Sequence, residues 1–277
     1  MFCPIFLALL LAAMGQQQKP PAPAAPTVDD LPPVVERGQK QFNFLPGGKL
    51  TVTLGVPGSC RIIGWQRSAI LLETERVVYH LPENEARLLL DQFPLRTRWT
   101  QTTASIGTQN PPTAEPHLEV NLTIYVPKTR TDISINLTKG DLAIGSVGGW
   151  VEATLVEGSL EATAMSGYFS ALTQRGDLRI EMAGDRWLGH SFTASTKWGS
   201  VDLRLPVHFS AALQLETQDG NLTVDFPAQV VDGEESPLAV VTHKKGKSVS
   251  ATVGDGGAAI RLRTNAGDVS LVQLPAP

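Results

Sequence analysis

The sequence predicts an all-β protein, a β-solenoid or closely related repeat β-structure built from short strands that turn at glycines. Two observations predict this fold class. Glycines recur every nine residues in the middle of the chain, and the second and fourth residues after each glycine are apolar. Side chains alternate between the two faces of a strand, so these apolar positions point inward together. A unit this small cannot bury its apolar face alone and must stack on copies of itself.

The regular block covers residues 138–183. Its glycines are Gly140, Gly149, Gly158, Gly167 and Gly176. The second positions are Leu142, Val151, Leu160, Phe169 and Leu178, and the fourth are Ile144, Ala153, Ala162, Ala171 and Ile180. At about 3.3 Å per residue, nine residues allow a strand of roughly five residues plus a corner. The three alanines predict a thin interior whose width the larger second-position side chains fill.

The chain before the repeats divides into two segments. An apolar run over residues 5–14, with small residues at positions 13 and 15 for cleavage before residue 16, predicts a signal peptide over residues 1–15, with a retained anchor as the alternative. Residues 16–40 are rich in Gln, Pro and Ala and predict an extended, disordered linker. The β-repeat domain is then expected over residues 41–275.

Strand patterns recur on both sides of the regular block. Before it, alternation predicts strands at residues 49–54, 69–74, 76–79, 118–126 and 131–137. Residues 81–90 predict the one helix, with Pro82 in its first turn. After the block, the glycine-led phrase returns at residues 199–205, 220–226 and 267–271, with longer loops between.

The composition limits the function classes. A net charge of -4 gives no reason to expect a nucleic-acid partner, because nucleic-acid binders usually carry a basic patch or stripe. Once Cys3 leaves with the signal peptide, Cys60 is the only cysteine, and no intramolecular disulfide can form. Because Cys60 adjoins strand-like sequence, we expect a buried, inert thiol.

The repeat phrases resemble a bacterial adhesin-like family of β-strand repeats, a domain of unknown function similar to the strand-repeat heads of some adhesins. The resemblance covers roughly residues 45–272. It is carried by Leu122–Pro127, Gly140-Asp-Leu, Gly176–Ile180, Gly199–Leu203 and Gly256-Gly257 with Thr264–Leu271. It implies a secreted or surface-exposed β-repeat protein and transfers no catalytic residue.

No pattern predicts a catalytic, cofactor-binding or metal-binding site. Gly189-His-Ser-Phe-Thr193 lacks the closing glycine of a nucleophile elbow. The nine-residue units carry one glycine each, and Asp follows it only at positions 141 and 177, so they differ from calcium-binding repeats. The five histidines have no paired metal-ligand spacing.

Two aromatic residues are candidates for ligand or partner contact. If two nine-residue units form one coil, residues eighteen apart lie above one another. Trp150 and Tyr168 then stack on one corner, and Asp141, Ser159 and Asp177 stack on the other. Outward aromatic rings can grip a sugar or a partner surface. The alternative is that they cover a neighbouring loop such as Trp187-Leu188.

Together these features predict an exported, non-enzymatic β-repeat protein that serves as an adhesin or cell-envelope interaction module. Its expected location is the periplasm, the cell surface or the medium, with no membrane span after signal cleavage. Its expected partner is a protein or glycan of the envelope. The alternative is a polysaccharide-active lyase or hydrolase on a β-helix, which needs acids or a metal with Arg or Lys on one outward face. The outward third positions of the block are Ala143, Glu152, Glu161, Ser170 and Arg179.

Overall fold

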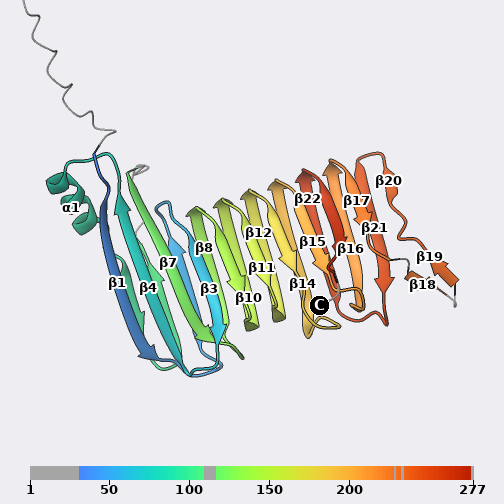
Figure 1. The fold of residues 1–277 in the computed structure, drawn as a ribbon, viewed down its shortest axis with the longest axis horizontal. Coiled ribbons are helices and arrows are strands. Elements are labelled where there is room, and N and C mark those ends of the chain that lie inside the picture. Colours follow the sequence, from blue (N-terminus) through green and yellow to red (C-terminus); the bar gives the residue numbers. More distant parts are fainter. Residues whose placement is uncertain (1–30, 109–116, 228, 232–233, 276–277) are drawn as a thin grey trace, which may run out of the picture.

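The computed structural model describes residues 31–108, 117–227, 229–231 and 234–275. Within these ranges the chain is all-β, with one helix and two large sheets of mixed strand direction that run the length of an elongated molecule (Figure 1). The predicted signal peptide, residues 1–15, lies outside the described residues.

The ten-stranded sheet contains, in spatial order, β1 (Val34–Asn43), β4 (Ala69–Val78), β7 (Leu118–Pro127), β3 (Cys60–Trp65), β9 (Leu142–Gly145), β11 (Leu160–Thr163), β13 (Leu178–Glu181), β15 (Val201–Leu205), β23 (Val269–Gln273) and β17 (Leu222–Asp225). The eleven-stranded sheet contains β20 (Val241–His243), β21 (Gly246–Val253), β16 (Ala211–Asp219), β22 (Ala259–Ala266), β14 (Gly189–Trp198), β12 (Ser166–Arg175), β10 (Gly148–Glu157), β8 (Asp132–Lys139), β2 (Lys49–Leu54), β6 (Thr103–Gly107) and β5 (Arg96–Trp99). A separate hairpin joins β18 (Gln229–Val231) and β19 (Glu234–Ser236).

The regular block alternates between the two sheets. Leu160 of β11 pairs in parallel with Leu142 of β9, eighteen residues earlier, and Phe169 of β12 pairs with Val151 of β10 in the other sheet. Two nine-residue units therefore make one coil, which places one strand in each sheet. Each coil lies directly on the previous one in register.

The core lies between the two sheets, and the predicted phase is confirmed. All ten predicted inward residues are buried, from Leu142 and Ile144 through Leu178 and Ile180. Ala162 is 1 % exposed, and the larger side chains of the second positions fill the space beside it. Phe169 stacks on Phe192 of the next coil at 4.4 Å between ring centroids.

The glycine corners require glycine for two reasons. Gly158 has a φ of 141°, and a Cβ there would overlap the carbonyl oxygen of Gly140 in the coil below.

Beside these glycines, the expected column of polar side chains is present. The Ser159 N–H donates to Asp141 Oδ1 at 2.8 Å, and the Asp177 N–H donates to Ser159 Oγ at 3.4 Å. Each corner thus gives the next coil a hydrogen-bond acceptor.

Three details differ from the sequence-based expectations. The strands are unequal, four residues in β9, β11 and β13 but ten in β10 and β12, because the latter include the corner residues. β1 begins at Val34, so the end of the predicted linker over residues 16–40 pairs with β4. The last coils are also reordered, since β23 lies between β15 and β17.

The predicted helix is confirmed with a shift of two residues. It forms α1 (Glu83–Gln92), which begins after Pro82 and buries Ala86, Leu89 and Leu90. It packs against β4 and β1 at the N-terminal end of the sheets. This end of the core is therefore partly covered.

Cys60 is buried, as predicted, and burial raises the pKa of its thiol from 9.0 to about 12. We expect native protein to resist thiol-reactive chromophores at pH 8 and to react fully in urea. The folded state keeps this thiol protonated up to a higher pH than the unfolded state does. The free energy of unfolding therefore falls as the pH rises from about 9 towards about 12. Rapid labelling of the native protein at pH 8 would contradict this assignment.

Candidate functional site

Trp150 and Tyr168 occupy matching outward positions on β10 and β12. Their rings stack at 3.9 Å between centroids and 22° between planes. Trp150 is 47 % exposed, and its Nε1 donates to Glu152 Oε1 at 2.9 Å. The structure therefore brings together both aromatic candidates, with one face of each ring used by the other.

The stacked pair does not shield the loop that the sequence offered as an alternative. Trp187 is buried and packs edge-on against Phe192, with 5.2 Å between ring centroids. Leu188 remains 69 % exposed. The Trp150–Tyr168 pair is consequently an outward feature of the eleven-stranded sheet.

We expect Trp150→Ala and Tyr168→Ala to be coupled in stability. An aromatic pair contributes about 0.5–1.5 kcal/mol beyond its buried area. The double variant should therefore lose less free energy of unfolding than the sum of the two single variants by about that amount. Urea unfolding of all four proteins measures the coupling, and strict additivity would show that the stacking adds nothing.

The outward face of the ten-stranded sheet carries a second candidate site. One line of outward positions, called the central row, crosses six neighbouring strands. Its members are Glu73, Thr123, Arg61, Ala143, Glu161 and Arg179. Both end residues of this row have a partner on the next strand. Gln39 Nε2 donates to Glu73 Oε1 at 3.1 Å, and Arg179 Nε lies 3.8 Å from Asp202 Oδ2.

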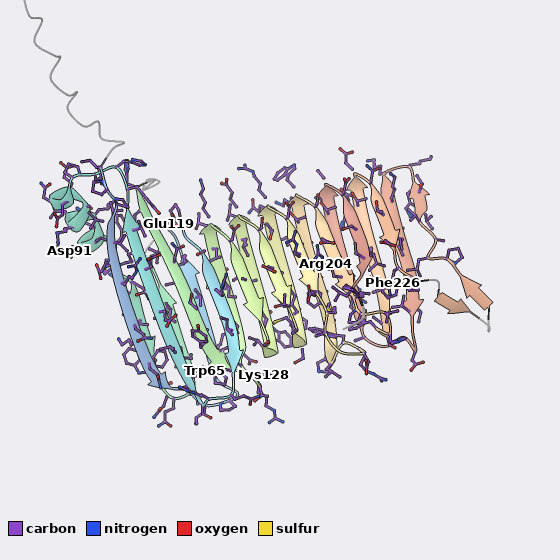
Figure 2. All side chains as sticks on the ribbon, in the orientation of Figure 1. Trp65, Asp91, Glu119, Lys128, Arg204 and Phe226 are labelled. Atoms are coloured by element: carbon purple, nitrogen blue, oxygen red, sulfur yellow. The ribbon has the colours of Figure 1, made fainter. Side chains whose placement is uncertain are left out.

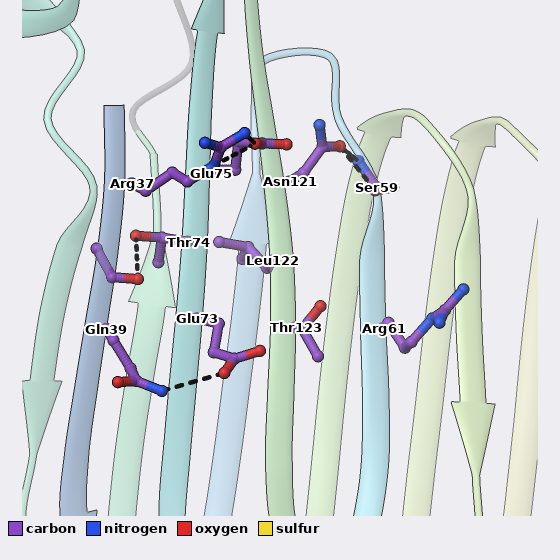
Figure 3. A pocket seen from close by; sticks show the side chains of 11 residues that line it. Arg37, Gln39, Ser59, Arg61, Glu73, Thr74, Glu75, Asn121, Leu122 and Thr123 are labelled. Atoms are coloured by element: carbon purple, nitrogen blue, oxygen red, sulfur yellow. Dashed lines mark hydrogen bonds and ion pairs between the residues drawn. The ribbon is translucent and has the colours of Figure 1, made fainter. Parts of the chain in front are cut away.

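Two shallow hollows lie in this face and meet at Ser59 and Arg61, which line both. The hollow toward β1 has a volume of about 630 Å³, and the hollow toward β13 about 490 Å³. Thr123 and Ala143, the two row neighbours of Arg61, have short side chains, which leaves this space open. Figure 3 shows the first hollow, with Arg61 reaching away from Thr123.

Arg61 is exposed, and no hydrogen bond or ion pair joins it to any residue in the described part of the chain. Glu161 is the next charged side chain in the row and lies two strands away. No ion pair joins these two side chains. The guanidinium of Arg61 is therefore free to bind a ligand.

The rows on either side of Arg61 differ in character. On one side, the polar row contains Ser59 and Asn121, where the Ser59 Oγ–H donates to Asn121 Oδ1 at 2.7 Å. On the other side, the apolar row contains Leu71, Tyr125 and Ile63, which are all half-buried. The site thus has a polar edge, a cationic centre and an apolar edge.

Neighbouring contacts fix both edges. Asn121 Nδ2 donates to Glu119 Oε1 at 2.9 Å, and the rings of Tyr125 and Trp65 lie 5.5 Å apart. Glu119 and Trp65 lie toward opposite ends of this face (Figure 2). Because the partners of Asn121 and Tyr125 hold them in place, the recognition surface is formed before a ligand arrives.

Sequence reasoning missed Arg61, although a signal was present. Arg61 is the third residue after Gly58, the same phase as Ala143 after Gly140 and Glu161 after Gly158. For metals, no group of three His, Cys, Asp or Glu side chains in the described ranges could hold an ion. His80 and His117 do approach each other, with ring centroids 6.5 Å apart.

No protein-family model and no curated protein matches the chain. Solved structures with some likeness include a "putative cell adhesion protein" from Clostridium sporogenes, 12% identical, covering 86% of this chain and 100% of that chain, with a TM-score of 0.42. A "putative adhesin" from Bacteroides fragilis is 10% identical, covers 86% and 97%, and has a TM-score of 0.28. A "putative lipid binding protein" from Parabacteroides distasonis is 10% identical, covers 86% and 97%, and scores 0.32. At such low scores and identities, no property of these proteins is carried over to this chain.

Proposed function

We propose that this chain is an exported, non-enzymatic β-solenoid of the adhesin-like type, which binds a component of the cell envelope through the outward face of its ten-stranded sheet. The solenoid assignment is supported by parallel strands that stack every eighteen residues. Export is supported by the short apolar run and small residues at the start of the sequence. In the part of the chain that the structure describes, no helix is long and apolar enough to cross a membrane.

The observation that carries the binding function is the unpaired guanidinium of Arg61 between two hollows. A cross-strand neighbour of opposite charge stabilises a charged side chain on a sheet. Here Thr123 and Ala143 occupy the partner positions, so the face presents a cation and open space together. This arrangement suits recognition of a polar partner.

The proposal includes the absence of turnover. The carboxylate of Glu73 accepts a hydrogen bond from Gln39, and Glu161 is the only other acid of the central row. Cleavage by a glycosidase mechanism needs two carboxylates flanking one bond. Glu73 and Glu161 lie four strands apart, which is about 19 Å, so they cannot act on the same bond. Asp141 and Asp177, which line the hollow toward β13 with Glu161, accept hydrogen bonds from the backbone N–H groups of Ser159 and Ser200.

Binding to an envelope fraction tests the proposed function. We expect purified full-length mature protein to bind solubilised envelope, and Arg61→Ala to weaken that binding at least tenfold. Arg263→Ala is the matched control, because Arg263 is an exposed arginine on the outward face of the eleven-stranded sheet. Equal loss with both variants, or no binding by the wild type, would refute the proposal.

An assay for new reducing ends or unsaturated products tests the absence of turnover on the same material. We expect no release of fragments from envelope polysaccharide. Release that is abolished by Glu161→Gln would instead support the polysaccharide-active alternative.

A further inference from the structure

The surroundings of Arg61 narrow the chemistry of its ligand. Ser59, just before β3, and the β3 residues Arg61 and Ile63 follow one another at about 6.6 Å, because every second residue faces the same side. On β7, Asn121, Thr123 and Tyr125 repeat the same order of polar, central and apolar positions. A ligand that bridges the Arg61 guanidinium and β7 therefore meets hydroxyl and amide groups on one side and half-buried apolar groups on the other.

We propose that this site binds a sugar ring that carries one anionic substituent, a carboxylate or a sulfate. This inference rests on the proposed function and names the ligand class of the same site. A planar guanidinium donates two parallel hydrogen bonds to a carboxylate or sulfate, which makes arginine well suited to such groups.

Both edges of the site match the rest of a sugar ring. Ser59 donates its hydroxyl hydrogen to Asn121, so the lone pairs of Ser59 Oγ remain free to accept from a sugar hydroxyl. The C–H face of the ring packs on Tyr125 and Ile63, since sugars present an apolar face to aromatic side chains. A simple inorganic anion would use Arg61 alone.

The acids of the central row affect which acidic oligosaccharides can bind to Arg61. Glu73 lies two strands from Arg61 on one side, and Glu161 lies two strands away on the other. A polymer lying along the row with a charge on every ring would bring some of its charges close to these carboxylates. Like charges disfavour such a complex. In a polymer of alternating acidic and neutral sugars, the next charges lie two rings away, about as far as Glu73 and Glu161 lie from Arg61, and meet the same repulsion. The site therefore prefers an oligosaccharide with a single acidic ring.

Calorimetric titration with four defined probes tests the inference. The probes are hyaluronan disaccharide fragments, which carry one carboxylated ring beside a neutral one, unsulfated cello-oligosaccharides, oligogalacturonate with a carboxylate on every ring, and a sulfated neutral oligosaccharide. We expect hyaluronan fragments to bind at least tenfold more tightly than cello-oligosaccharides and more tightly than oligogalacturonate. Comparison with the sulfated probe decides which anionic group is preferred.

Variants connect the binding to Arg61. Arg61→Gln should weaken hyaluronan binding at least tenfold, Arg61→Lys should retain part of it, and Arg263→Gln should leave it unchanged. Arg61 is exposed, so its substitution should leave thermal unfolding unaltered. The affinity should also fall as salt rises, because the contact is ionic.

Three results would overturn the inference. They are equal affinity for cello-oligosaccharides and hyaluronan, an Arg61→Gln protein that binds hyaluronan as wild type does, and no binding of any acidic probe. Arg61-dependent binding to envelope material without binding of acidic sugars would reject the ligand class alone. Failure of the wild type to bind any envelope material would reject the proposed function itself.

Discussion

Ala162→Asp should destabilise the protein by about 4 kcal/mol or more, or prevent folding altogether. Ala162 is 1 % exposed and lies on β11 between Ile144 and Ile180 of the adjacent coils. A carboxylate there would be buried without a partner, which is among the most damaging single changes. Thermal and urea unfolding of the purified variant, or its loss to inclusion bodies, measures the effect.

Glu161→Ala is the control for this substitution, because Glu161 is the adjacent residue and points outward. It should change the free energy of unfolding by no more than about 0.5 kcal/mol. If Glu161→Ala were the more damaging change, β11 would have to face the opposite way.

Gly158→Ala should be the second most damaging change, with a loss of about 3 kcal/mol or more from a single methyl group. Its Cβ would overlap the carbonyl oxygen of Gly140, and backbone on both sides prevents either group from moving away. The coil below must shift, which disturbs the hydrogen bond that the Gly140 N–H donates to the Glu157 carbonyl. Urea unfolding compared with wild type measures the loss.

Gly184→Ala separates this overlap from backbone strain. Gly184 has a φ of 77°, and a Cβ there would meet no atom within 4 Å. The Gly184→Ala variant should therefore lose only about 1–2 kcal/mol in free energy of unfolding, which is the cost of an alanine in the left-handed backbone conformation. Equal losses at Gly158 and Gly184 would mean that the close approach between coils is unimportant.

The part of the fold that could be predicted is the part that depends on local pattern. Alternation and the nine-residue glycine period fix which side chains face inward, so residues from Leu142 to Ile180 were assigned correctly. The spacing of eighteen likewise predicted the stack of Trp150 on Tyr168. Both depend only on residues close in sequence.

The order of the last coils could not be predicted, because strands of equal phase can stack in more than one order. Val269 of β23 pairs with Val201 on one side and with Leu222 on the other, although the Leu222 strand comes first in the chain. All three strands carry the same glycine and apolar positions. Only their long connections, whose sequence has no regular period, distinguish the alternatives.

The site around Arg61 was hidden for a related reason. Arg61 and Ala143 are direct neighbours in the sheet but lie 82 residues apart in the chain. No regular spacing links Gly58 to Gly140, so the shared phase did not reveal that β3 extends the stack. The antiparallel arrival of β4 beside β7, which supplies Glu73, is likewise a tertiary feature.

The eighteen-residue coil makes the length of this molecule adjustable in discrete steps. Each coil adds one strand to each sheet, and neighbouring strands are about 4.8 Å apart. Duplication of one whole coil would lengthen the protein by that distance while every later strand kept its sheet and register. Duplication of nine residues would instead send each later strand to the opposite sheet. Evolution or design can therefore change the reach of this protein by whole coils without rebuilding its core.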